Sequence, residues 1–249
     1  MRPVKRGNAP LNEEGNPKVY RKYGNARRDL VNRLGEYCSY CEMHLDTSLA
    51  VEHIIPKTHF PHLELVWSNF LLACTNCNST KGAEPESGDL SPYYWPHIHN
   101  TFLAFDYDDE GVTKAASHLN PAQKQKAKRT IDLMGLDAKP DKDNASDRRW
   151  QNRQEAWRDA QDCKADIAET LSDLAGRISS ERLERVVNRI KDGAIRTAKA
   201  KGYWSIWMTV FQNDADMIAR LVNASNFKGT DTACFDRNFQ ALERVGGEL

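Results

Sequence analysis

The sequence predicts an α+β protein, in which a small core held by four cysteines precedes a mostly α-helical C-terminal region. Three observations support this: two closely spaced CxxC pairs, a short β-branched segment between them that ends at a proline, and several later stretches with helical hydrophobic periodicity. The expected regions are a basic N-terminal arm (1–33), a compact domain with an acidic, aromatic insertion (34–118) and a helical region (119–249).

The cysteine pairs predict a structural metal site. Cys38 and Cys41 form one pair, and Cys74 and Cys77 form the other. Two such pairs can present four thiolates tetrahedrally to one zinc ion, and a closed four-coordinate site leaves no position for a substrate. Zn²⁺ is therefore expected to hold the fold together rather than to catalyse. The alternative is a set of unrelated buried or redox cysteines.

The segment between the pairs predicts a strand, a loop and a helix. Residues 49–55 (LAVEHII) are rich in β-branched and apolar residues and stop at Pro56, which indicates a short strand ending at a turn. His53 would then lie at a rigid strand end. Asn69 follows in the loop, and Asn78 directly follows the second cysteine pair, in the first turn of the expected helix.

These residue types suit phosphodiester hydrolysis. A histidine can deprotonate water near neutral pH, because its ordinary pKa is about 6.5. Oxygen ligands such as Glu52 and Asn78 suit Mg²⁺ or Mn²⁺, which can neutralise charge on a reacting phosphate. The chain would then hold two metals with different tasks. For His53 the alternative is a buried core histidine, and for Asn69 it is an ordinary loop-capping residue.

Two lysines near these residues are candidate nucleic-acid contacts. Lys81 lies three residues after Asn78 and would share its helix face, where it could meet a substrate phosphate. Lys57 follows Pro56 directly. For both, a solvated surface lysine is the alternative interpretation.

Residues 38–82 resemble the HNH endonucleases, a family of ββα-metal nucleases. The resemblance rests on the four cysteines, the acidic-His-x-x-Pro element, the middle asparagine and the Cys-Asn-x-x-Lys-Gly ending. It implies that His53 is the general base, that Asn69 holds the loop that orients it, and that Asn78 is a metal ligand. Glu52 stands where many members carry an aspartate ligand, and Asn78 where many carry histidine. The longer Glu52 side chain would have to fold back to reach the same ion.

Flanking segments add a narrower resemblance, to the HNH nuclease subunits of Septu and retron-associated anti-phage systems. It extends to about residue 115 and rests on MRPVKRG, Leu34–Glu42, Val51-Glu-His, residues 67–74 and Asn100-Thr-Phe. It implies a nuclease held by a separate ATPase subunit of the SMC- or ABC-like kind and released or activated on infection. This partner comes from the resemblance alone.

The charge distribution is uneven although the net charge is zero, with 35 basic and 35 acidic residues. Residues 1–33 hold nine Lys or Arg against three acids, which indicates either a phosphate-tracking arm or a solvated, partly disordered terminus. Residues 84–110 hold seven acids and no Lys or Arg, so we expect them to face away from nucleic acid or toward a protein partner. Residues 111–130 hold five basic residues and no acid, a second candidate phosphate contact.

The remaining features concern location and linkers. No apolar run is long enough to cross a bilayer, and residues 1–7 are charged without a following apolar stretch, so we expect a cytoplasmic protein with reduced thiols and no membrane partner. Residues 139–146 (KPDKDNAS) are expected to be a linker.

Other local signals predict secondary structure. We expect a short helix at roughly 21–34, a hairpin strand at 101–107 and a helix that Asn120-Pro121 opens. Helical apolar periodicity predicts three further helices, around 157–174, 183–194 and 203–221.

The leading hypothesis is a metal-dependent endonuclease that cuts DNA in bacterial defence. One alternative keeps the enzyme and changes the substrate to RNA, such as tRNA, because the same water activation could hydrolyse either. The other is a zinc-stabilised binding scaffold without catalysis, which the Glu52 and Asn78 departures favour.

Overall fold

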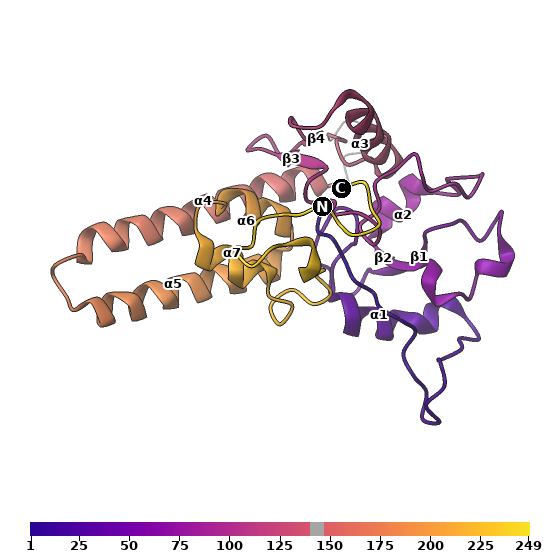
Figure 1. Ribbon diagram of the computed structural model, residues 1–249, viewed down its shortest axis with the longest axis horizontal. Helices are drawn as coiled ribbons and strands as arrows, with labels where there is room; N and C mark the ends of the chain where they lie inside the picture. Colours follow the sequence, from indigo (N-terminus) through magenta and orange to yellow (C-terminus); the bar gives the residue numbers. More distant parts are fainter. Residues whose placement is uncertain (140–146) are drawn as a thin grey trace.

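The computed structural model describes residues 1–139 and 147–249, and these confirm the α+β class (Figure 1). Short strands and helices make up the N-terminal half, and long helices make up most of the C-terminal half. Apart from Lys139, the predicted linker lies outside the described residues. Within the described residues, no helix is both long and apolar enough to span a membrane.

The segment between the cysteine pairs folds in the expected order. Strand β1 (Ala50–His53) pairs antiparallel with β2 (Phe70–Ala73), and α2 (Thr75–Lys81) follows directly. The register places His53 opposite Phe70, at the end of the sheet where the loop begins. That loop holds two short 3₁₀ helices, η2 (Pro61–Leu63) and η3 (Trp67–Asn69). All four residues of β2 are buried, so this strand anchors the site to the core.

The helix expected before the first cysteine is present but starts with a 3₁₀ turn. Helix η1 (Tyr23–Ala26) leads into α1 (Arg27–Leu34), whose buried residues Leu30 and Leu34 join the core that contains β2. Apolar residues spaced four apart place one helix face on the core and leave the other in solvent.

The first residues of the chain correct the expectation of a free basic arm. Arg2 is 4% exposed, and its guanidinium donates hydrogen bonds to the carbonyls of Leu34 (2.9 Å) and Lys228 (2.6 Å). Arg6 donates to the carbonyl of Phe70 at 2.6 Å. Both cations therefore satisfy backbone carbonyls and tie the chain's start to α1, β2 and the C-terminal region, so they cannot track phosphates. The exposed basic residues of positions 1–33 are Lys5 and those from Lys18 onward.

The acidic insertion ends in a hairpin and a capped helix. Strands β3 (Phe105–Tyr107) and β4 (Thr113–Ala115) pair antiparallel, and the expected strand start at Thr101 is a turn instead. Helix α3 (Pro121–Met134) begins at Asn120, which forms a capping box with Gln123.

The C-terminal region is helical, as expected. Helices α4 (Arg149–Leu174) and α5 (Ser180–Lys201) form an antiparallel hairpin that projects from the body (Figure 1). The third predicted helix is two, α6 (Trp204–Val210) and α7 (Ala215–Val222), because Asp214 turns its side chain to cap α7 at Met217. A last 3₁₀ turn, η4 (Thr232–Cys234), follows.

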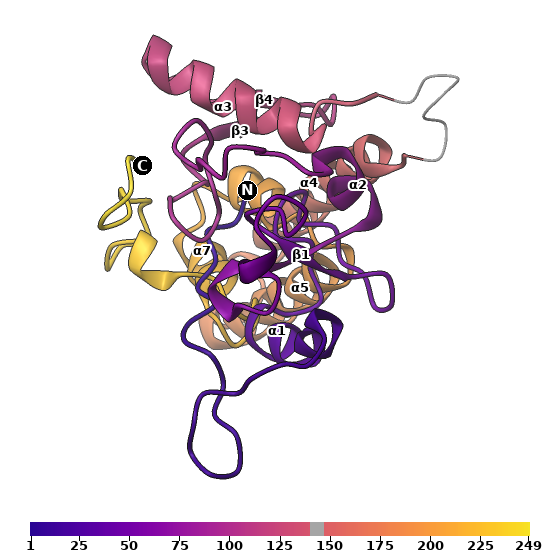
Figure 2. The same cartoon turned by 90° about the vertical axis from the view of Figure 1, so that its right-hand side faces the viewer.

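The helical region is attached directly to the first cysteine pair. The Tyr203 amide donates to the Glu42 carbonyl at 2.9 Å, and the Ser205 hydroxyl donates to the Glu42 carboxylate at 2.8 Å. One apolar core surrounds the two sheets, and a second joins α4 to α7. Both end residues, Met1 and Leu249, are buried in the first core. In Figure 2 the N-terminus lies near the centre of the view and the C-terminus at its left side.

Candidate functional site

The four predicted cysteine ligands meet in one buried cluster. Cys38, Cys41, Cys74 and Cys77 are all at most 4% exposed, and their sulfur atoms lie within 4.8 Å of one another. A Zn–S bond of about 2.3 Å in a tetrahedron separates sulfurs by about 3.8 Å, and Cys41 Sγ lies 3.7 Å from Cys74 Sγ. Within each pair, the amide of the second cysteine donates to the sulfur of the first. The cluster is therefore suited to a zinc ion.

A buried arginine adjoins this cluster, and no sequence pattern predicted it. Arg149, the first residue of α4, is 2% exposed, and its guanidinium lies 3.1 Å from Cys77 Sγ. It also donates to the Met134 carbonyl at 2.7 Å and pairs with Asp147 at 2.7 Å. Four thiolates around Zn²⁺ carry a net charge of −2, so a buried cation beside them offsets part of it. The start of the long hairpin is thereby tied to the metal cluster.

The geometry of His53 suits a general base. Its Nε2 lies 2.9 Å from the Glu64 carbonyl oxygen, and because a carbonyl only accepts, Nε2 carries the proton in the neutral ring. Nδ1 then keeps a free lone pair. The ring packs edge-on against Tyr23 and Phe70, at centroid distances of 4.9 and 5.4 Å. Burial lowers the pKa of His53 below its usual 6.5, so the ring is neutral at pH 7.

Asn69 joins two stretches of the loop that follows His53. Its side-chain oxygen accepts from the Ile55 amide at 2.7 Å, and its amide nitrogen donates to the carbonyls of Ile55 (2.8 Å) and Leu63 (3.3 Å). Leu63 precedes Glu64, whose carbonyl orients the His53 ring. Asn69, which is 5% exposed, therefore links the segment after His53 to the segment at Glu64, whose carbonyl determines which nitrogen of the His53 ring carries the proton.

Glu52 of β1 and Lys81 of α2 form a buried ion pair. Lys81 Nζ lies 2.8 Å from Glu52 Oε1 and also donates to the His53 carbonyl at 2.9 Å. The Glu52 side chain is 5% exposed and the Lys81 side chain 1%. Burial raises the pKa of Glu52, and the ammonium opposes this rise. The prediction that Lys81 reaches a substrate phosphate from the helix surface is wrong, because its apolar stem and ammonium lie inside the protein.

Asn78 and Lys57 lie at the edge of the site. Asn78 is partly exposed and makes no side-chain hydrogen bond within the described residues. It lies one turn before Lys81 on α2, on the face that Lys81 turns toward the His53 backbone. Lys57, 38% exposed, pairs with Glu64 at 3.2 Å and lies 4.1 Å from the centre of the Tyr23 ring. Of the two predicted lysine contacts, only Lys57 is within reach of a ligand.

The oxygen atoms near His53 offer a modest fit for a hard cation. Lys81 pairs with Oε1 of the buried Glu52 carboxylate, so Oε2 is the oxygen of this side chain that forms no ion pair among the described residues. The Asn78 side-chain oxygen is the second available ligand. Mg²⁺ commonly binds through one or two protein oxygens and keeps several waters, so two ligands suffice if substrate phosphate completes the shell.

Comparisons with known proteins agree with this geometry. Residues 38–84 match the model of the HNH endonuclease family. This part of the chain is therefore an HNH endonuclease domain with a four-cysteine cluster suited to zinc.

One relative extends the match beyond this domain. The chain is 33% identical over 93 residues to the Septu protein PtuB of Bacillus thuringiensis, and is a homologue of it. The aligned segment covers 32% of this chain and 36% of that protein, so about a third of each is compared.

Proposed function

We propose that the chain is a metal-dependent endonuclease that hydrolyses phosphodiester bonds in DNA, with His53 as general base. The observation that carries this proposal is the hydrogen bond between His53 Nε2 and the Glu64 carbonyl at 2.9 Å, which leaves Nδ1 unprotonated inside an HNH domain.

The surroundings of His53 support this role through the whole proton transfer. When Nδ1 takes a proton from water, the ring becomes an imidazolium, and the Nε2–H bond to Glu64 becomes charge-assisted and stronger. Tyr23 and Phe70 hold the ring plane, and Asn69 holds the following backbone at Ile55 and Leu63. Burial favours release of the proton afterwards, because it disfavours the charged ring.

A divalent cation, Mg²⁺ or Mn²⁺, would be held by Glu52 Oε2 and Asn78, and would supply charge neutralisation at the phosphate. The zinc cluster takes no part in this chemistry, because its four thiolates fill the coordination shell.

The direct test is incubation of the purified wild-type chain with supercoiled plasmid and with total RNA, in metal-depleted buffer or with Mg²⁺ or Mn²⁺ added. We expect nicked and linear plasmid only when metal is present. Cleavage of RNA with intact plasmid would replace the substrate assignment by RNA. If neither is cut, the non-catalytic scaffold becomes the better proposal, and the engaged Glu52 carboxylate is the observation that favours it.

We further propose that the nuclease acts in anti-phage defence with an ATPase subunit of the SMC- or ABC-like kind, as in Septu and retron-associated systems. Similarity to the Septu protein PtuB supports this role. Co-purification of the tagged chain with an ATPase encoded beside it tests the partnership. Recovery of the chain alone under conditions where both are expressed would contradict it.

A further inference from the structure

A basic hollow lies beside the candidate catalytic histidine. It measures about 420 Å³ and is lined by Tyr23, Glu64 and the exposed cations Arg21, Lys22 and Arg27. Tyr23 packs against the His53 ring, and the Glu64 carbonyl orients it. A ligand in this hollow would therefore be separated from His53 by a single layer of side chains.

A second and larger hollow, of about 570 Å³, lies at the other end of α1. Residues 31–37 and His44 form one wall, and α5 and the loop at 225–228 form the others. Its cations are Arg196, Lys199 and Lys228, which are exposed and form no ion pair among residues 1–139 and 147–249. Glu36 is the acid on this lining, and it lies 3.8 Å from His44 Nε2. The hollow thus carries an excess of unpaired positive charge.

Helix α1 connects the two hollows along one exposed face. At 100° per residue, Arg27, Arg28, Val31 and Asn32 fall within one arc of about 140° on the helix, which excludes the buried leucines. The acid of this helix, Asp29, lies outside that face and is held by Lys18 at 2.6 Å and by the Tyr20 hydroxyl at 2.9 Å. The surface between the hollows is therefore positive or neutral along its length.

We infer that this surface is a phosphate track, along which a nucleic-acid strand runs from His53 across α1 to the hollow at Arg196, Lys199 and Lys228. The inference rests on the proposed function and specifies where its substrate binds. Eight helical residues span about 12 Å along the track. The far hollow would hold phosphates several nucleotides from the cleaved bond. Because its side-chain donors are mainly cations, it would bind strands without reading sequence.

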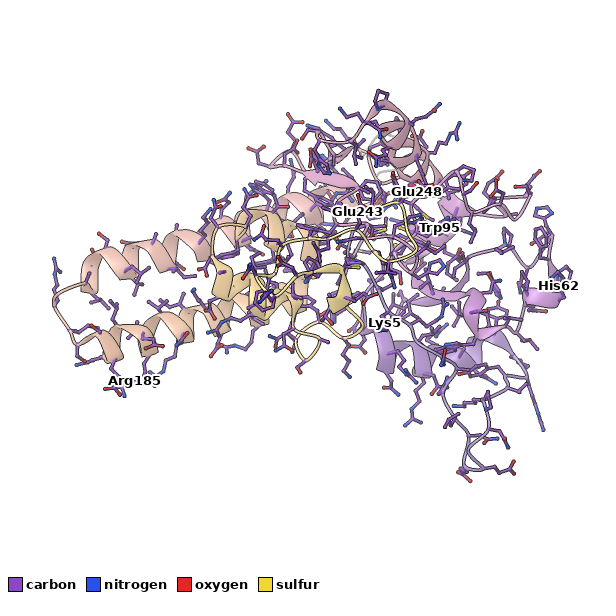
Figure 3. The ribbon with its side chains drawn as sticks, in the orientation of Figure 1. Lys5, His62, Trp95, Arg185, Glu243 and Glu248 are labelled. Atoms are coloured by element: carbon purple, nitrogen blue, oxygen red, sulfur yellow. The ribbon has the colours of Figure 1, made fainter. Side chains whose placement is uncertain are left out.

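Binding measured without cleavage tests the track. In the His53→Ala background, we would titrate fluorescein-labelled 20-nucleotide DNA, RNA of the same sequence and a four-nucleotide DNA, by anisotropy from 50 to 200 mM KCl. The test variant is Arg196→Glu/Lys199→Glu/Lys228→Glu. The matched control, Arg177→Glu/Arg182→Glu/Arg189→Glu, makes the same charge change on exposed residues of the hairpin. Figure 3 shows Arg185, in the same part of α5, at the opposite end of the molecule from His62 of the loop between β1 and β2.

Each phosphate contact on a single strand contributes about 0.7 to the slope of log affinity against log salt. Loss of three contacts should lower the slope by about 2 and weaken 20-mer binding about 100-fold at 0.1 M salt, with little change for the control or the four-nucleotide probe. Comparison of the DNA and RNA titrations shows which kind of strand binds along the track. An unchanged slope, an equal loss in the control, or no binding to any probe would overturn the inference. Because cleavage is assayed separately on the wild type, failure of the nuclease proposal remains distinguishable.

Discussion

The buried pair between Glu52 and Lys81 makes Lys81→Met the most informative stability variant. Methionine keeps most of the apolar stem but removes the ammonium, which lies 2.8 Å from Glu52 Oε1 and 2.9 Å from the His53 carbonyl. Glu52 would be left as a buried, unpaired carboxyl at the strand that carries His53.

The expected cost follows from burial. Removing one partner of a fully buried ion pair costs about 3–5 kcal/mol. This is a large part of the free energy of unfolding of a typical domain, about 5–15 kcal/mol. For a chain of this size, about 2–4 °C per kcal/mol predicts a fall of about 6–20 °C in the melting temperature. Glu52→Gln/Lys81→Met removes both charges and should be more stable than Lys81→Met alone.

Thermal and urea unfolding of the zinc-loaded chain measure these costs. Lys57→Met is the matched control, because its pair with Glu64 is 38% and 43% exposed and should contribute at most about 1 kcal/mol. A Lys81→Met variant that loses no more stability than Lys57→Met would refute the view that this pair is buried and structural.

Three further predictions follow from the site. Asn69→Ala removes the partner of the partly buried Ile55 amide and carbonyl, so it should cost about 1–3 kcal/mol in urea unfolding. Activity that persists undiminished in the folded variant would argue against its role in orienting the loop. Because burial lowers the pKa of His53, the cleavage rate should rise with pH through an apparent pKa below 6.5 and level off by pH 7. The unfolded chain binds this proton more tightly than the folded chain does, so His53 also makes the fold less stable below pH 6.5. A rising limb centred above 6.5 in kcat/KM would contradict this. Arg149→Met should weaken zinc retention about 10–100-fold in a chelator competition, because its guanidinium lies 3.1 Å from Cys77 Sγ; unchanged retention would mean that Arg149 only packs.

The sequence predicted the site well where function depends on residue spacing. The CxxC pairs, the strand that ends at His53, the loop asparagine and the following helix all follow from patterns within 45 residues, from Cys38 to Gly82. Local signals also placed the start of α3, because Asn120-Pro121 indicates a helix start on its own.

Contacts between distant segments could not be predicted in this way. Arg2 and Lys81 have the composition of surface residues, and only the fold shows that carbonyls of residues 34 and 228, and the carboxylate of Glu52, meet them inside the protein. Arg149 reaches Cys77 across 72 positions of sequence. The break between α6 and α7 depends on Asp214, which pairs with Lys191 of another helix. A single sequence carries no periodic or spacing signal for such pairs.

The central claim is that His53 acts as a general base in hydrolysis. The most direct measurement is single-turnover plasmid cleavage with Mg²⁺ or Mn²⁺ by the wild type and by His53→Ala, with zinc content and melting temperature determined for both. General-base catalysis contributes about 10²–10⁴-fold, so the variant should lose at least about 100-fold in rate while it retains zinc and fold. A zinc-loaded, folded variant that cleaves within a few-fold of the wild type would contradict the account.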